Sequence, residues 1–151
     1  MKTRTFVSIL ILVLAVLIIL GSCATTKKVA KKDYRFFSGI WVNEEYNSHP
    51  FMAKYVIFSD GTFDAYNRLT DTGKHGSGHY IIVDKWTDSE GNRWYKMHVW
   101  GGVVVEGKPD MYELDKFSNS GNVWEFISLT GDFPPELDKS QFRYHIYYRQ
   151  E

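Results

Sequence analysis

Hydrophobic and polar positions alternate along most of the chain after residue 37, with the two-residue period that is typical of strands with one buried face. In one such segment the hydrophobic residues Tyr95, Met97 and Val99 are separated by a lysine and a histidine. Turn-forming sequences, such as Ser-Asp-Gly at 59–61, interrupt the pattern at short intervals and mark hairpins. No segment of this region repeats with the period of an amphipathic helix.

This pattern predicts eight strands joined by short connections. We place them at residues 39–46, 52–59, 62–68, 78–87, 92–100, 110–117, 122–129 and 141–150. Such strands favour an antiparallel up-and-down arrangement, and closing it into a barrel leaves no unpaired edge. The predicted fold class is therefore all-β, a single antiparallel up-and-down barrel of about eight strands, and an open sandwich is the alternative. A barrel of this size holds either packed side chains or one small ligand.

The beginning of the chain has a different pattern. Lys2 and Arg4 precede an uncharged, almost entirely apolar run from Phe6 to Leu20. As a helix this run would be about 22 Å long, shorter than the roughly 30 Å hydrocarbon core of a bilayer. A basic start, a short apolar run and the small residues after it indicate an exported protein with a signal peptide at residues 1–22.

The only cysteine of the chain, Cys23, follows these small residues. The sequence Leu20-Gly21-Ser22-Cys23 resembles the lipobox of bacterial lipoproteins. The resemblance implies that Cys23 carries a diacylglycerol on its thiol and that acyl chains hold the mature protein at a membrane of the bacterial envelope. Ala24 after Cys23 is compatible with an outer membrane where the cell has one. The alternatives are an ordinary signal peptide with an incidental cysteine and an uncleaved anchor helix.

Residues 23–36 are predicted to carry the lipid and to form a tether. Within them, residues 24–33 contain four lysines and no aromatic residue, so little apolar surface is available for burial and we expect disorder. The folded domain then spans residues 37–151, which is enough for one domain but not for two. A single cysteine allows no disulfide within the chain.

Composition favours strands and argues against a nucleic-acid partner. The chain has 10 Phe, 10 Tyr and 5 Trp, of which only Phe6 lies in the predicted signal, and aromatic residues favour pleated surfaces. The formal net charge of the whole chain is zero, but residues 34–151 contain 12 basic and 17 acidic residues. A negative domain without a basic stripe is not expected to bind nucleic acid.

The sequence Gly39-Ile40-Trp41, at the start of the first predicted strand, resembles the Gly-x-Trp signature of lipocalins and related calycin barrels. In that family the tryptophan closes one end of the barrel, and an arginine near the end of the last strand packs across its ring. In a closed meander of eight strands, the end of the last strand lies beside the start of the first. Arg149 occupies this place, whereas Arg143 would lie near the opposite end, so the resemblance implies that Arg149 covers Trp41.

No sequence pattern indicates a catalytic site, a cofactor or a metal site. His75 and His79 flank a glycine-rich turn, where their spacing does not make them converge on one ion as it would on a helix. Glu44 and Glu45 are neighbours on a predicted strand, so their side chains point to opposite faces. Asp84 is either an inward acid or the cross-strand partner of a lysine. Because no serine lies in a nucleophile elbow either, we predict that the protein is not an enzyme.

Two functions remain, and the interior of the barrel distinguishes them. In the first, a cavity that reaches solvent binds a small hydrophobic or amphiphilic ligand. The candidate ligand contacts are aromatic or long apolar side chains: Tyr80, Tyr95, Met97, Trp124 and Tyr144. In the second, the interior is filled and an outer aromatic surface binds another envelope protein. That surface would comprise Trp86, Trp94, Trp100 and residues 101–109.

Overall fold

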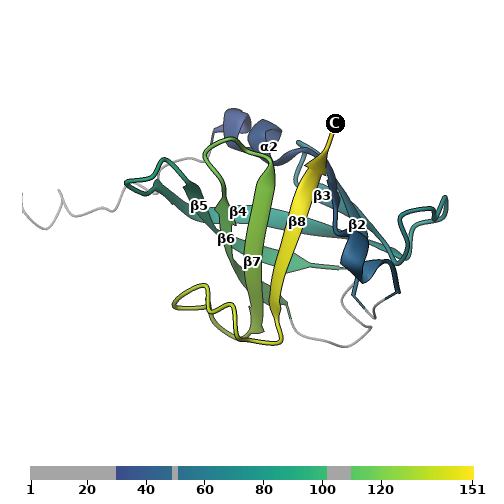
Figure 1. Ribbon diagram of the computed structural model, residues 1–151. Coiled ribbons are helices and arrows are strands. Elements are labelled where there is room, and N and C mark those ends of the chain that lie inside the picture. Colours follow the sequence, from purple (N-terminus) through teal and green to yellow (C-terminus); the bar gives the residue numbers. More distant parts are fainter. Residues whose placement is uncertain (1–29, 49–50, 102–109) are drawn as a thin grey trace, which may run out of the picture.

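A computed structural model describes residues 30–48, 51–101 and 110–151, in which eight strands form one closed barrel (Figure 1). The strands are β1 (Gly39–Val42), β2 (Lys54–Ile57), β3 (Thr62–Tyr66), β4 (Gly76–Thr87), β5 (Arg93–Trp100), β6 (Met111–Phe117), β7 (Val123–Thr130) and β8 (Tyr144–Gln150). Each strand pairs antiparallel with its neighbours in chain order. The predicted all-β, up-and-down, lipocalin-like barrel is confirmed.

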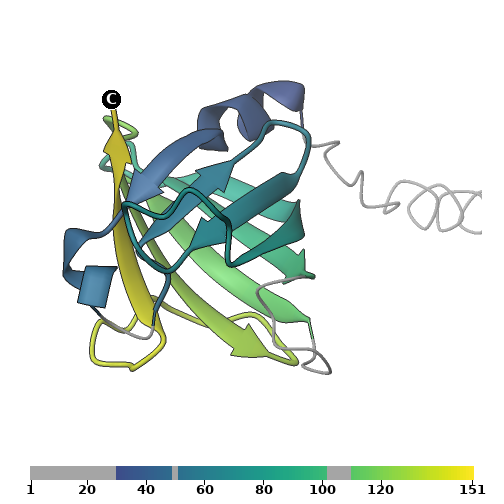
Figure 2. The ribbon, with the colours of Figure 1, turned by 90° about the vertical axis from the view of Figure 1, so that its right-hand side faces the viewer.

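The barrel closes because β8 pairs antiparallel with β1, which leaves neither strand with a free edge (Figure 2). The register places Trp41 opposite Arg149. We call the end of the barrel that holds this pair the closed end. The opposite end, which we call the open end, carries the connections β1–β2, β3–β4, β5–β6 and β7–β8.

The first strand is shorter than predicted, because Asn43 turns the chain. Its side chain accepts a hydrogen bond from the backbone N–H of Glu45 (2.9 Å) and donates one to the carbonyl oxygen of Ile146 (2.8 Å). A side chain bonded to the backbone two residues ahead starts a turn rather than a ladder. Residues Glu44–Ser48 therefore form the 3₁₀ helix η1 instead of strand. The other strand bounds differ from the predicted ones by at most three residues.

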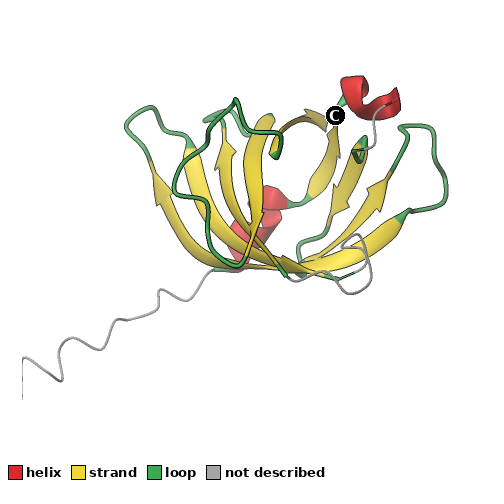
Figure 3. Cartoon of the chain, turned by 90° about the horizontal axis from the view of Figure 1, so that it is seen from below, coloured by secondary structure: helices red, strands yellow, loops and turns green. Residues whose placement is uncertain are grey.

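Residues 31–36 form most of a helix, whereas the sequence predicts a tether there. Helix α2 (Lys31–Phe37) lies across the closed end of the barrel, as Figure 3 shows from below. The side chain of Phe37 is 1% exposed, and its ring centroid lies 4.3 Å from that of Phe117 and 5.3 Å from that of Tyr95. A helix this short is unstable alone, so burial of Phe37 is what holds it in place.

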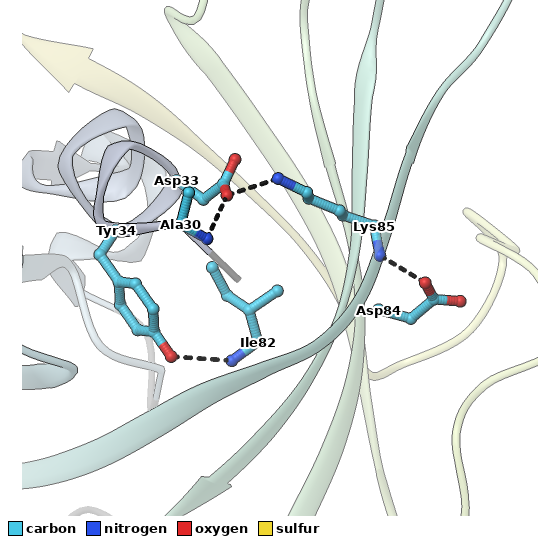
Figure 4. A network of polar contacts seen from close by, with 6 residues as sticks. All are labelled: Ala30, Asp33, Tyr34, Ile82, Asp84 and Lys85. Carbon is cyan, nitrogen blue, oxygen red and sulfur yellow. Dashed lines mark hydrogen bonds and ion pairs between the residues drawn. The ribbon is translucent and has the colours of Figure 1, made fainter. Parts of the chain in front are cut away.

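Polar contacts attach the first turn of α2 to β4 (Figure 4). Asp33 is buried, accepts a hydrogen bond from the backbone N–H of Ala30 (3.1 Å) and forms an ion pair with Lys85 (2.5 Å). The hydroxyl oxygen of Tyr34 accepts a bond from the backbone N–H of Ile82 (3.5 Å). These contacts and Phe37 make α2 part of the barrel rather than part of a tether.

Arg149 joins three segments of the closed end. Its guanidinium carbon lies 4.4 Å from the ring centroid of Trp41, within the range of a cation–π interaction. The guanidinium also donates hydrogen bonds to the carbonyl oxygens of Phe36 (2.7 Å), Ser38 (2.8 Å) and Gly121 (3.0 Å). One side chain therefore links α2, the start of β1 and the β6–β7 turn.

Gly39 makes room for this arginine. Its φ is +145°, and a Cβ at this position would lie 2.7 Å from Nη1 of Arg149. The next inward residue, Trp41, is fully buried and donates from Nε1 to the carbonyl oxygen of Phe37 at 3.0 Å. The glycine is thus required by the close approach of the arginine as well as by its backbone conformation.

The sequence features before residue 30 lie outside the described residues. They are the predicted signal peptide at 1–22, the predicted lipidation site Cys23 and most of the predicted tether; residues 49–50 and 102–109 also lie outside. Within the described ranges, no helix is both long enough and apolar enough to cross a membrane.

Candidate functional site

A cavity of about 340 Å³ occupies the interior of the barrel. Phe37 of α2 lines its inner end, and Phe51, Phe142 and Arg143 line it at the open end. The cavity reaches the surface there, because Phe142 is 76% exposed. Between these ends the walls are mostly aromatic and aliphatic: Tyr55, Ile57, Phe63, Tyr80, Met97, Val99, Trp124, Phe126 and Tyr147. Its size lies at the lower end of the range for small-molecule sites.

Three of the five candidate ligand contacts line this cavity, namely Tyr80, Met97 and Trp124. Tyr95 is buried below it, where its ring packs against Phe37 and Phe117.

Tyr144 does not line the cavity, although the sequence analysis placed it among the ligand contacts. It faces outward, and its hydroxyl donates to a carboxylate oxygen of Glu125 on the outer face of β7. The inward residues of β8 are His145 and Tyr147, because this strand pairs Tyr147 with the inward Trp124. The prediction of Tyr144 as a ligand contact is thus wrong.

Hydrogen bonds from tyrosine hydroxyls to the backbone hold the cavity walls. Tyr147 donates to the carbonyl oxygen of Met52 (2.7 Å), and Tyr80 donates to that of Phe58 (2.7 Å). Burial raises the pKa of both phenols above the usual range. The hydroxyls therefore stay protonated and keep donating, which leaves the aromatic walls in fixed positions.

The cavity wall contains an acid that the sequence pattern does not predict. Glu113 of β6 is buried, lines the cavity and accepts a hydrogen bond from the hydroxyl of Ser128. Burial raises the pKa of Glu113 to about 7, and the bond from Ser128 opposes this shift. The carboxyl group is therefore poised to gain or lose a proton near neutral pH.

A second buried acid, Asp115, lies two residues further along the inner face of β6. It is fully buried, and its Oδ1 accepts a hydrogen bond from Nε1 of Trp124 at 2.7 Å. Its Oδ2 has no hydrogen-bond partner among the described residues. Burial, and next the charge of Glu113, raise the pKa of Asp115 well above the usual range. The raised pKa favours the neutral form of Asp115, and its hydrogen bond fixes one edge of the Trp124 ring.

Acidic side chains are rarely buried, which explains why the alternation of β6 gave no signal for these two residues. The segment Met-Tyr-Glu-Leu-Asp-Lys-Phe suggests an inward Tyr112 and Leu114 with outward acids, and the structure has the reverse. Leu114 is nonetheless buried, on the outer face, where it shares a groove with Phe133 and Pro134 of the β7–β8 connection.

The outer tryptophans do not form one surface. Trp86 and Trp94 stack at the closed-end side of β4 and β5, with ring centroids 5.7 Å apart, and Trp86 is 41% exposed. Trp100 lies at the other end of β5 and stacks on His79 instead (5.5 Å). Of the associated segment 101–109, only Gly101 lies within the described residues.

The other candidate groups are separate from the cavity. His75 and His79 are exposed, and among the described residues no three histidine, cysteine or acidic side chains are placed to hold a metal ion. Glu44 and Glu45 are exposed in η1. Asp84 is exposed beside a β-bulge and lies opposite Lys96 in the register of β4 and β5.

Comparison of the chain with models of known protein families, with curated proteins and with solved structures gives no match.

Proposed function

We propose that the chain is a lipid-anchored bacterial envelope protein whose barrel binds a small hydrophobic or amphiphilic molecule and catalyses no reaction on it. The observation that carries the proposal is the cavity of about 340 Å³, which is lined by aromatic side chains and reaches the surface at the open end. Aromatic walls supply a large contact area, and a few polar groups orient a ligand. Glu113 and Ser128 supply such groups inside the cavity.

Ligand binding is tested by native mass spectrometry of the full chain, purified from its host in a mild detergent. We expect a non-covalent adduct that dissociates on collisional activation and is identified after solvent extraction. Val99→Phe, which places a larger side chain in the cavity, is expected to remove the adduct. The matched control is Val83→Phe, because Val83 is 47% exposed on the outer face of β4. An adduct that survives Val99→Phe, or the absence of any adduct on the wild-type chain, contradicts the proposal.

The membrane anchor rests on the lipobox-like sequence that ends at Cys23. We expect the wild-type chain, made in a bacterial host with a labelled fatty acid, to incorporate the label and to sediment with membranes. Cys23→Ser is expected to abolish labelling, because serine lacks the thiol that the diacylglycerol modifies. Labelling of the Cys23→Ser chain would contradict acylation at Cys23. A wild-type chain without label would favour an ordinary signal peptide or an uncleaved anchor helix.

A second candidate function is an interaction with another envelope protein, and the exposed tryptophan stack favours it. Trp86 and Trp94 border a groove that continues to Phe133 and Pro134 on the outside of the barrel. Aromatic residues are enriched at the core of protein interfaces. This function predicts that Trp86→Ala weakens binding to the partner, whereas Val99→Phe has no effect on it.

A further inference from the structure

Glu113 presents an unused hydrogen-bond acceptor to the cavity. Among the described residues, its only hydrogen-bond partner is Ser128, which bonds to Oε1. The second oxygen, Oε2, therefore has no protein partner in this part of the chain. Glu113 lines the cavity, whereas Asp115 does not. A ligand in the cavity can reach it.

No cation of the described residues forms an ion pair with Glu113. A carboxylate buried without a cation is costly, and a partner that supplies the positive charge offsets that cost. No cation in the described parts of the chain supplies this positive charge, so a bound cation would stabilise the ionised form of Glu113.

Aromatic rings line the same cavity as this acid. Tyr55, Trp124 and Tyr147 contact one another, with ring centroids 5.3–5.9 Å apart, and all three line the cavity. The faces of such rings attract cations, most strongly where water is excluded. A carboxylate beside several aromatic rings is a combination that suits an organic ammonium group.

We infer that the ligand of the barrel is a small hydrophobic amine, whose ammonium group binds Oε2 of Glu113 and whose apolar part contacts Tyr55, Trp124 and Tyr147. This inference rests on the proposed function and specifies the ligand class of the same cavity. An anionic ligand is disfavoured there, because its charge would face the carboxylate of Glu113. A neutral ligand would leave the carboxylate without a counter-charge.

Other titratable groups lie around Glu113. Asp115 follows it towards the closed end on the same strand, and Tyr55 and Tyr147 face it from β2 and β8. Arg143 and His145 line the cavity towards the open end. Arg143 is exposed, so water screens its charge. The guanidinium of Arg143 thus lies on the open-end side, and further inward the cavity is lined by Glu113, Tyr55 and Tyr147.

The inference is tested with three probes of one shape, namely phenylpropylamine, phenylpropanol and phenylpropanoate. Their binding to the full chain in lipid nanodiscs is measured by calorimetry at pH 8, with empty nanodiscs as the blank. We expect the amine to bind about 10- to 100-fold more tightly than the alcohol, because a charge-assisted hydrogen bond adds to the shared apolar contacts. The carboxylate is expected to bind most weakly.

Glu113→Gln is expected to reduce the affinity for the amine to about that for the alcohol. The affinity for the alcohol is expected to stay unchanged. Glu136→Gln, which makes the same change at an exposed position, is the control and is expected to have no effect. On the wild-type chain the amine is expected to bind about tenfold more weakly at pH 6 than at pH 8, because Glu113 is then mostly protonated. This comparison of amine binding at two pH values needs no variant.

Two results would overturn the inference, and they differ in what else they imply. If the alcohol binds as tightly as the amine, the ligand is not an amine, but the cavity still binds small molecules. If none of the three probes binds, the inference and the proposed function both fail.

Discussion

Replacing Arg149 with alanine is expected to lower the free energy of unfolding by about 3–5 kcal/mol. The variant removes the donors to three carbonyl oxygens, those of Phe36, Ser38 and Gly121. It also removes the cation from the face of Trp41. Because these partners belong to separate segments of the closed end, the loss is expected to release α2 and the β1–β8 seam together.

Urea unfolding of the full chain, followed by tryptophan fluorescence, measures this loss. The free energy of unfolding of Arg149→Lys is expected to lie between those of the wild type and the alanine variant, because one ammonium group cannot reproduce a planar guanidinium that bonds three carbonyl groups. Arg143→Ala is the control, since Arg143 is exposed at the open end. If Arg149→Ala stays within 1 kcal/mol of the wild type, the proposed role of Arg149 is wrong.

Stability is expected to decrease as the pH rises from about 5 to about 8. Glu113 has an ordinary pKa of 4.5 and a folded-state pKa of about 7, and the pKa of Asp115 is raised as well. An acid with a raised pKa in the folded state stabilises the fold below its ordinary pKa, and this contribution is lost as the pH rises through the folded-state pKa. The shift of Glu113 alone corresponds to about 3 kcal/mol.

The measurement is a series of urea unfolding curves across this pH range. Glu113→Gln is expected to reduce the dependence of the free energy of unfolding on pH, because glutamine has no proton to lose. Glu136→Gln is expected to leave this dependence unchanged. Below about pH 4 the opposite trend is expected from partly exposed acids such as Asp88, because the hydrogen bond from Trp94 holds its pKa at about 2. A wild-type stability that is constant or rises between pH 5 and pH 8 would contradict the burial of the two acids.

The fold was predictable because its signals are local and because closure adds one geometric condition. Turn residues separate the strands, and an even number of strands in a closed meander brings the chain end back to its start. The contact between Trp41 and Arg149 then follows from position in the chain. α2 was not predictable in this way, because seven residues are too few to show a helical period and the helix depends on the burial of Phe37.

The candidate site was only partly predictable. Met97 and Trp124 lie on strands whose alternation is clear, and both line the cavity. The last strand is aromatic on both faces, so its pattern did not distinguish Tyr144 from Tyr147. Glu113 was missed for a different reason: burial of an acid opposes the usual preference for water and depends on neighbours that only the closed barrel brings together.

The most direct test of the account is where a small molecule binds on the full chain. Fluorine NMR of the protein labelled with fluorotryptophan gives one signal for each of the 5 tryptophans, which single Trp→Phe substitutions assign. On titration with the tightest of the three phenylpropyl probes, the signal of Trp124 is predicted to shift, with those of Trp86 and Trp94 unchanged. Shifts of Trp86 and Trp94 with an unchanged Trp124 would place binding on the outside of the barrel and contradict the account.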